Sequence, residues 1–237
     1  MSVEITESTR WIDFLGWLEV NKQRLFIAVA LLGATGIGFA VVQNSRANQE
    51  SEASRSLLAL HIPLNAPTNT PAIPAASFAK VAGDFNGTRA GERANILAAG
   101  TIYNEGKYPE AQVEFQKFLT AFASSPWAPT AALGLASALE AQGKNDEALR
   151  AYQTVISGYP TASVVESAKF SEARIHQAKN QPDQALKVYD DLIKPSNTSM
   201  RSSDAFQLRE LLLKKYPNLV KPAVVPTASL TNAVPSK

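Results

Sequence analysis

The side chains that most often carry catalysis or bind metals are scarce in this chain. There is no cysteine, and the only two histidines are His61 and His176. The lack of cysteine excludes internal disulfides, thiolate nucleophiles and every zinc or iron–sulfur site with a cysteine ligand. The histidines lie far apart without an HExxH-like frame, and we expect no carboxylate partner at ligand spacing for either one. Each is predicted to be an ordinary solvated or half-buried histidine.

The remaining polar clusters have simple structural explanations. Asp190 and Asp191 are adjacent, so on a helix their carboxylates diverge by about 100° and do not meet at one atom. The serines Ser199, Ser202 and Ser203 are interpreted as loop and cap residues of a final helix. No glycine-rich phosphate loop follows a predicted strand. We therefore predict no catalytic residue, no cofactor and no metal; the remote alternative is an enzyme that works without cysteine or histidine.

Composition also limits the classes of partner. The chain has 23 Lys and Arg against 21 Asp and Glu, a net charge of +2 over 237 residues. This is too small for a protein that binds nucleic acid mainly by neutralising phosphates. We expect no nucleic acid and no small-molecule substrate. At roughly 100 to 200 residues per domain, the length allows one compact domain with attachments.

Residues 25–43, LFIAVALLGATGIGFAVVQ, form an uncharged apolar stretch. At about 1.5 Å per residue it matches the roughly 30 Å hydrocarbon core of a bilayer. Lys22 and Arg24 precede it and only Arg46 follows closely, which places the N-terminus in the cytoplasm. A cleavable signal peptide is the alternative, although its apolar region is shorter, about 7 to 15 residues, and lies nearer to a basic N-terminus. We predict one retained, single-pass transmembrane anchor.

Two features of this region could contact a membrane surface or another helix. Residues 1–24 carry Trp11, Phe14, Leu15 and Leu18 at helical spacing, which is typical of an amphipathic segment on the cytoplasmic surface or simply of the start of the anchor. Inside the span, a row of small residues allows close approach of a second helix and is compatible with a homo-oligomer. This row consists of Ala30, Ala34 and Gly38.

Proline content divides the rest of the chain. Residues 44–60 are polar and helix-compatible, whereas residues 62–74 contain four prolines, so residues 44–74 are predicted to be a helical stalk and a proline-rich spacer. Residues 217–237 also contain four prolines with too little apolar mass for a core, which predicts a disordered tail. The folded domain is therefore expected over residues 75–216.

An internal repeat with a period of 37 residues is the most informative feature of this domain. Three segments that begin at Gly106, Gly143 and Asn180 align without gaps. The aligned positions are two small residues, an aromatic and an apolar residue: Ala99, Ala111, Phe115 and Phe118, then Ala136, Ala148, Tyr152 and Val155, then Ala173, Ala185, Tyr189 and Leu192. The pattern predicts a stack of antiparallel helical hairpins, an all-α solenoid.

Each aligned position has a physical reason. The glycine or asparagine ends a helix with positive φ, and the next helix tolerates Pro109 or Pro182 in its first turn, with Asp146 or Asp183 suited to capping. The small residues let two helices approach, and the aromatics fill the space between successive pairs.

At these residues the chain resembles the tetratricopeptide repeat family. The alanine twelve residues after the first small residue, the aromatic four later and a closing proline (Pro126, Pro160 or Pro195) match the family pattern in place and order. The usual unit has 34 residues, and the extra three fall in inter-repeat loops. The third unit departs from the pattern, because Glu172 and His176 replace large apolar groups. The resemblance implies repeats near 90–126, 127–160 and 163–195, followed by a capping helix over 203–216.

The whole layout resembles a more specific bacterial family, the ancillary subunits of the Sec translocon that accompany an anchored periplasmic chaperone. That family combines a short cytoplasmic segment, one N-terminal anchor and a few divergent tetratricopeptide repeats. The resemblance implies an inner-membrane protein with a periplasmic repeat domain, whose partners are translocon components, the anchored chaperone or emerging polypeptides. The rival interpretation is a repeat adaptor for outer-membrane assembly or cell division.

The family resemblance also implies a partner-binding groove lined by the first helix of each repeat. Carrying its positions over gives Arg93, Ile96, Gly100, Tyr103 and Asn104, then Thr130, Leu133, Ser137 and Glu140, then Ser167, Phe170, Arg174 and Gln177. Ile96, Leu133 and Phe170 are equivalent, so they would form a continuous apolar strip for a peptide or helix. The alternative is that a helix around residues 76–86, with Phe78, Val81 and Phe85, covers this strip as ordinary core.

Overall fold

A computed structural model describes residues 4–61, 71–194 and 201–219 of the chain. These residues form α-helices and a short 3₁₀ helix, with no strand in the ranges described. The predicted all-α class is therefore confirmed. The chain divides into two compact units, Met1–Asn95 and Ile96–Lys237.

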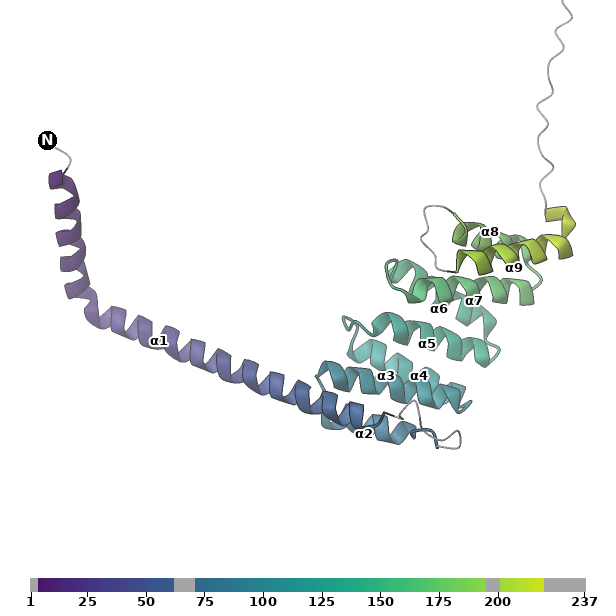
Figure 1. Cartoon of the computed structure of the whole chain (residues 1–237), viewed down its shortest axis with the longest axis horizontal. Coiled ribbons are helices and arrows are strands. Elements are labelled where there is room, and N and C mark those ends of the chain that lie inside the picture. Colours follow the sequence, from purple (N-terminus) through teal and green to yellow (C-terminus); the bar gives the residue numbers. More distant parts are fainter. Residues whose placement is uncertain (1–3, 62–70, 195–200, 220–237) are drawn as a thin grey trace, which may run out of the picture. The chain divides into compact units, whose positions relative to one another are not determined.

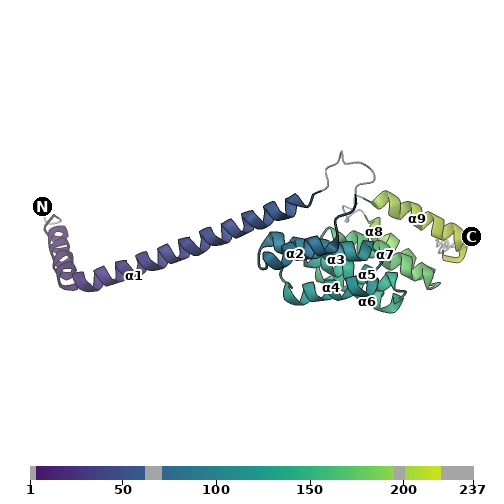
Figure 2. The same cartoon turned by 90° about the horizontal axis from the view of Figure 1, so that it is seen from below.

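The first unit begins with one long helix. Helix α1 runs from Glu4 to Ala59, 56 residues, and so includes the predicted cytoplasmic segment, the apolar stretch and most of the predicted stalk. Both views show that its N-terminal part is bent (Figures 1 and 2). An 18-residue window of this helix has a mean hydropathy of 2.4 and is not buried inside the protein. By length and composition, α1 can cross a membrane.

The C-terminal end of α1 is packed against the following helices. Ala53 is fully buried, and Leu57 and Leu60 contact a hydrophobic cluster from α2 (Ala75–Asp84) and the start of α3 (Arg89–Asn104). The buried members of the cluster are Val81, Ala82 and Ala94. The prediction of a stalk is therefore wrong for residues 53–60, because their small and apolar side chains pack into this core. The proline-rich residues 62–70 lie outside the described ranges.

The second unit is a stack of consecutive helices in which each helix contacts the next from α4 to α9 (Figure 1). Short connections force neighbouring helices to run antiparallel. The helices are α4 (Tyr108–Ala121), α5 (Ala128–Ala141), α6 (Asn145–Gly158), α7 (Val164–Ala178), α8 (Pro182–Leu192) and α9 (Ser202–Lys215), followed by η1 (Pro217–Leu219).

The turns inside the three hairpins have the predicted backbone geometry. The φ angles of Gly106, Gly143 and Asn180 are 77°, 75° and 55°. Glycine adopts this left-handed region without a steric penalty, and asparagine tolerates it better than most other residues. The period of 37 residues is thus a period in backbone conformation as well as in sequence.

The predicted N-terminal caps are wrong, although the predicted prolines are correct. Pro182 and Pro109 lie in the first turns of α8 and α4. The cap positions of α6 and α8 are Lys144 and Gln181, and neither side chain makes a capping hydrogen bond. Asp146 instead lies inside the first turn and pairs with Lys179 of the next repeat, so the carboxylate connects two hairpins.

The aligned small and aromatic residues form the cores of the hairpins. Ala111, Ala148 and Ala185 are all fully buried. The aromatic side chain of each second helix fills space against the next first helix, and Gly134 of α5 provides this space for Phe115. A methyl group added to Gly134 would overlap the Phe115 ring. The predicted close packing of helices is confirmed at these positions.

The last helix covers the third repeat with only part of its apolar surface. Ala205 and Leu212 are buried in a cluster with Tyr189 and Leu192. Phe206 and Leu211, which were also expected to cover the repeat, remain exposed. Beyond α9, residues 217–219 form a 3₁₀ turn rather than the start of a disordered tail. The remainder of the predicted tail lies outside the described residues.

Candidate functional site

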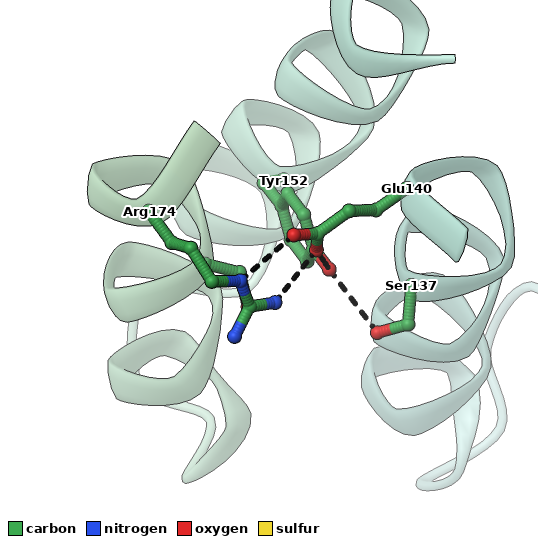
Figure 3. A network of polar contacts seen from close by, with 5 residues as sticks. Ser137, Glu140, Tyr152 and Arg174 are labelled. Carbon is green, nitrogen blue, oxygen red and sulfur yellow. Dashed lines mark hydrogen bonds and ion pairs between the residues drawn. The ribbon is translucent and has the colours of Figure 1, made fainter. Parts of the chain in front are cut away.

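The first helices of repeats two and three are joined by a carboxylate–guanidinium pair. Arg174 of α7 donates from Nε to Oε1 of Glu140 in α5 and from Nη2 to Oε2, both at 2.8 Å (Figure 3). Two parallel hydrogen bonds fix the orientation of both groups and strengthen the pair. The Glu140 side chain is 18% exposed, whereas that of Arg174 is 65% exposed. The carboxylate is therefore sheltered, while the guanidinium faces solvent.

Tyr152 of α6 reaches the same carboxylate from the second helix of repeat two. Its hydroxyl donates to Oε2 of Glu140 at 2.7 Å, and Oγ of Ser137 lies 3.2 Å from that hydroxyl. Arg174 also donates to Oγ of Ser171 at 3.2 Å. Burial raises the pKa of Tyr152 to about 12, opposed by hydrogen bonds to Ser137 and Ser171. Tyr152 therefore stays a neutral donor at physiological pH.

A similar arrangement recurs one repeat later. Gln177 donates from Nε2 to the hydroxyl of Tyr189 at 2.7 Å. These two residues lie 37 positions after the glutamate and tyrosine described above. Burial raises the pKa of Tyr189 as well, so its hydroxyl is also a neutral group. In repeat one the corresponding residues are Tyr103 and Phe115, and a phenylalanine cannot offer a hydroxyl.

Tyr103 brings the first helix of repeat one into the same region. Its ring packs against that of Tyr108, with 5.2 Å between the centroids. Burial raises the pKa of Tyr103, as do the nearby Tyr108 and Glu140, whereas Arg174 lowers it. The hydrogen bond to Glu140 in turn raises the pKa of Arg174. Side chains from α3, α5 and α7 therefore interact electrostatically on the first-helix face.

The predicted continuous apolar strip does not exist as an open surface. Ile96 is only 8% exposed and packs in the core of repeat one. Leu133 packs against the core of repeat two, and Phe170 against that of repeat three. Arg201 covers the Phe170 ring, with its guanidinium carbon 4.3 Å from the centroid. The three side chains belong to three separate clusters because each one seals its own hairpin.

The alternative cover for this strip is also wrong. Val81 is buried and Phe85 packs beside it, but their cluster is the one that holds Leu57, Leu60 and Ala94. Helix α2 therefore uses its apolar face to bind the end of α1 and the start of α3.

The other predicted contact residues differ in exposure. Arg93, Asn104 and Gln177 are exposed, and Gly100, Thr130 and Ser167 are half-buried. In α1, the small residues Ala30, Ala34 and Gly38 are all exposed. The structure thus brings together Tyr103, Ser137, Glu140, Arg174 and Gln177 as a polar face, hereafter the first-helix polar face, and leaves the membrane-helix residues on a separate element.

Sequence reasoning missed two polar contributions. The Tyr152 and Tyr189 hydroxyls were interpreted only as parts of packing aromatics, although the spacing of twelve residues to Glu140 and Gln177 could have shown both pairs. In addition, His176 does have a carboxylate partner.

The partner of His176 is Glu172, one turn earlier in α7. Nε2 of His176 lies 3.8 Å from Oε1 of Glu172, and Nδ1 lies 2.9 Å from Oε1 of Gln181. Gln153 of α6 also donates to Glu172 at 3.2 Å. These polar groups satisfy one another where the usual repeat has apolar packing. Within the described ranges, no group of three or more histidine, aspartate or glutamate residues could hold a metal ion.

Comparison with solved structures finds other helical repeat proteins. Two crystal structures of a Podosopora anserina putative kinesin light chain with nearly identical TPR-like repeats share 15% sequence identity with this chain. Their TM-scores are 0.44 and 0.45; the matches cover 73% of this chain and 93% and 92% of theirs. No curated protein sequence matches the chain.

The family comparison is more direct. A model of the tetratricopeptide repeat-like domain matches residues 16–158, which is more than half of the chain. The matched range begins within α1 and ends with α6, so it includes the apolar helix as well as repeats one and two. The turns, the buried alanines and this match together show that the chain belongs to the tetratricopeptide repeat-like domain family.

Proposed function

We propose that this chain is a membrane-anchored, non-catalytic scaffold that binds other proteins in the bacterial envelope. Tetratricopeptide repeats generally act as protein-binding scaffolds. The finer assignment is an ancillary subunit of the Sec translocon or of a periplasmic chaperone network, with the N-terminus in the cytoplasm and the repeats in the periplasm. This assignment is supported by the combination of one apolar N-terminal helix with a short repeat array.

The exposed apolar surface of α1 is the observation that carries the proposed anchoring. Phe26, Leu32 and Phe39 are 75%, 73% and 67% exposed, and their neighbours in the apolar stretch are similarly uncovered. An exposed run of large apolar side chains around a whole helix is unfavourable in water, whereas lipid covers it without leaving a backbone group unpaired. The length of the run matches a bilayer.

The first-helix polar face is the proposed site of partner binding. Glu140 neutralises much of the charge of Arg174, and the tyrosine hydroxyls are neutral, so the face offers hydrogen bonds without a strong net charge. Such a surface suits a polypeptide partner and not a polyanion. Arg174 and Gln177 are its exposed members and are the residues expected to contact the partner.

Affinity purification from detergent-solubilised membranes, followed by mass spectrometry, tests the proposed partners. The proposal predicts Sec components or an anchored chaperone in the eluate of the wild-type chain. Arg174→Ala with Gln177→Ala should reduce their recovery, whereas Lys187→Ala on the second helix α8 serves as an exposed control. Recovery of outer-membrane assembly or division proteins alone would replace this assignment with the adaptor function.

Anchoring and orientation need a separate measurement. Alkaline extraction should leave the full-length chain in the membrane fraction, and protease added to spheroplasts should remove the repeat domain. A soluble chain that begins after the apolar stretch would identify a cleaved signal peptide. Digestion only after permeabilisation would reverse the proposed orientation.

A further inference from the structure

Helix α2 ends in the same way as the second helices of repeats one and two. It ends at Asp84, and α4 and α6 end 37 and 74 residues later, at Ala121 and Gly158. The next residue in each case is aromatic and donates its backbone N–H to the carbonyl four residues earlier. These bonds join Phe85 to Val81, Phe122 to Phe118 and Tyr159 to Val155.

The side chains of α2 follow the same period. Phe78, Val81 and Phe85 lie 37 residues before Phe115, Phe118 and Phe122. Val81 is buried, as is its equivalent in repeat one. The repeat therefore extends one unit towards the N-terminus without a gap, and α2 occupies the position of a second helix. A second helix needs a first helix to cover its apolar face.

The end of α1 occupies the position of that first helix. Glu50 of α1 accepts hydrogen bonds from the backbone N–H groups of Arg89 at 2.7 Å and Ala90 at 3.0 Å, which are at the start of α3. These are the amides that a helix leaves without internal partners, and a carboxylate there is favoured by the helix dipole.

The same contact recurs at the other end of the array. Glu166 of the first helix α7 accepts a hydrogen bond from the N–H of Arg201, at the start of α9, at 3.0 Å. Arg201 lies 111 residues after Ala90, which is three periods of 37. In both places, a glutamate from one first helix caps the next one. The fully buried Ala53 of α1 also matches the buried alanine of each later first helix: Ala94, Ala131, Ala168 and Ala205.

We propose that residues 50–60 of α1 and helix α2 form a fourth, N-terminal hairpin, so that the anchor helix itself provides the first helix of the repeat array. The proline-rich loop replaces the tight turn of the other hairpins. This part of the inference is independent of the membrane. Its further consequence rests on the anchoring proposed above.

The consequence concerns the distance between this hairpin and the bilayer. Glu50 follows the last apolar residue of the predicted span by only seven residues, which is about 10 Å along a continuous helix. The N-terminal hairpin is therefore held at the membrane surface. A partner that binds this hairpin has to present its binding segment there, as the surface loops of an integral membrane protein do.

Hydrogen exchange of the full-length chain in detergent tests the hairpin. Ala53→Leu should accelerate exchange of the amides of α2 and the first turn of α3 at least tenfold, because the added atoms have no space. Ala59→Leu makes the same change at an exposed position of α1 and should not. Glu50→Gln is a milder variant that should accelerate exchange only at the first turn of α3, with Glu52→Gln as its exposed control. Unchanged exchange of α2 and α3 in both Ala53→Leu and Glu50→Gln would overturn the hairpin.

An insertion tests the membrane-surface position. Seven helix-forming residues inserted after Arg46 add about two turns, so the hairpin moves about 10 Å outward while its orientation around α1 is nearly kept. Exchange in α2 should stay as in the wild-type chain, and recovery of membrane partners should fall at least fivefold. Unchanged recovery would overturn the surface position. If alkaline extraction released the chain from membranes, the proposed anchoring would fail, while the exchange result for the hairpin would remain valid.

Discussion

Repeats one and two share the same helical hairpin but differ at the position where the two helices meet near the first-helix face. Repeat one has Tyr103 and Phe115 there, whereas repeat two has Glu140 and Tyr152, joined by a hydrogen bond of 2.7 Å. The backbone turn before each second helix is nevertheless the same, with φ of 77° and 75°. The polarity of this position is therefore independent of the hairpin geometry.

The parts that do not vary are the small contact residues. The alanines of the three second helices, Ala111, Ala148 and Ala185, are fully buried in all repeats. They allow two helices to approach closely, which no larger side chain would permit. The hairpin is thus specified by small residues and turns, and the adjacent polar positions are left to determine what each repeat binds.

The largest expected effect comes from changing an invariant small residue. Ala148→Leu should lower the free energy of unfolding by about 3 kcal/mol, because the added atoms force α5 and α6 apart. Ala141→Leu, the same change at an exposed position of α5, should have little effect. Chemical denaturation of the full-length chain in detergent measures both. Equal stability of the two variants would mean that the hairpin does not depend on close packing at Ala148.

Alkaline pH should distinguish repeat two from repeat one. The pKa of Tyr152 is about 12 in the folded protein, against an ordinary value of 10.0. The folded state therefore keeps its proton to higher pH, so this contribution to stability is complete below pH 10 and is lost as the pH rises towards 12. Relative to Tyr152→Phe, the wild-type chain should lose about 2 kcal/mol between pH 9 and 11.5. Parallel loss in both proteins would contradict the assignment to Tyr152.

The junction between repeats one and two should be more sensitive to added volume than the next junction. Gly134→Ala places a methyl group against the buried Phe115 ring and should cost about 1 to 2 kcal/mol. The equivalent position one repeat later is Ser171, where Ser171→Ala adds no volume and should change stability by less than about 1 kcal/mol. Thermal unfolding of the two variants measures the difference. A neutral Gly134→Ala variant would show that the ring can move aside.

Much of the fold could be predicted from the sequence because its determinants are local. Gly106, Gly143 and Asn180 indicate positive φ by their residue types, and a regular spacing of alanines indicates helix contact without knowledge of distant residues. The end of α1 was misinterpreted for the opposite reason. Residues 50–60 look polar and unremarkable, and only the contacts of Glu50 and Ala53 with residues about 30 to 40 positions later show that they are packed.

The candidate site was predicted at the level of positions and not of roles. The repeat pattern placed Tyr103, Arg174 and Gln177 on one face, but it treated Ile96 and Phe170 as open surface. Their burial depends on how far each apolar side chain reaches into its own hairpin, which periodicity alone does not encode. The ion pair between Glu140 and Arg174 joins different repeats, so no spacing within a single repeat indicates it.

The smallest effect on stability, and the most specific for function, is expected at that ion pair. Arg174 is largely exposed, so Arg174→Ala should change the free energy of unfolding by only about 0.5 to 1 kcal/mol, as other exposed ion pairs do. Its effect on binding should be greater, because the variant removes an oriented donor and leaves the sheltered carboxylate of Glu140 without its main counter-charge. Partner recovery from solubilised membranes should therefore fall severalfold while the unfolding curve is nearly unchanged. The double variant Arg174→Ala with Glu140→Gln separates two explanations: restored recovery would show that the uncompensated carboxylate repels the partner, and continued loss would show that the guanidinium contacts it. Full recovery in the single variant would exclude the first-helix polar face of repeats two and three as the binding site.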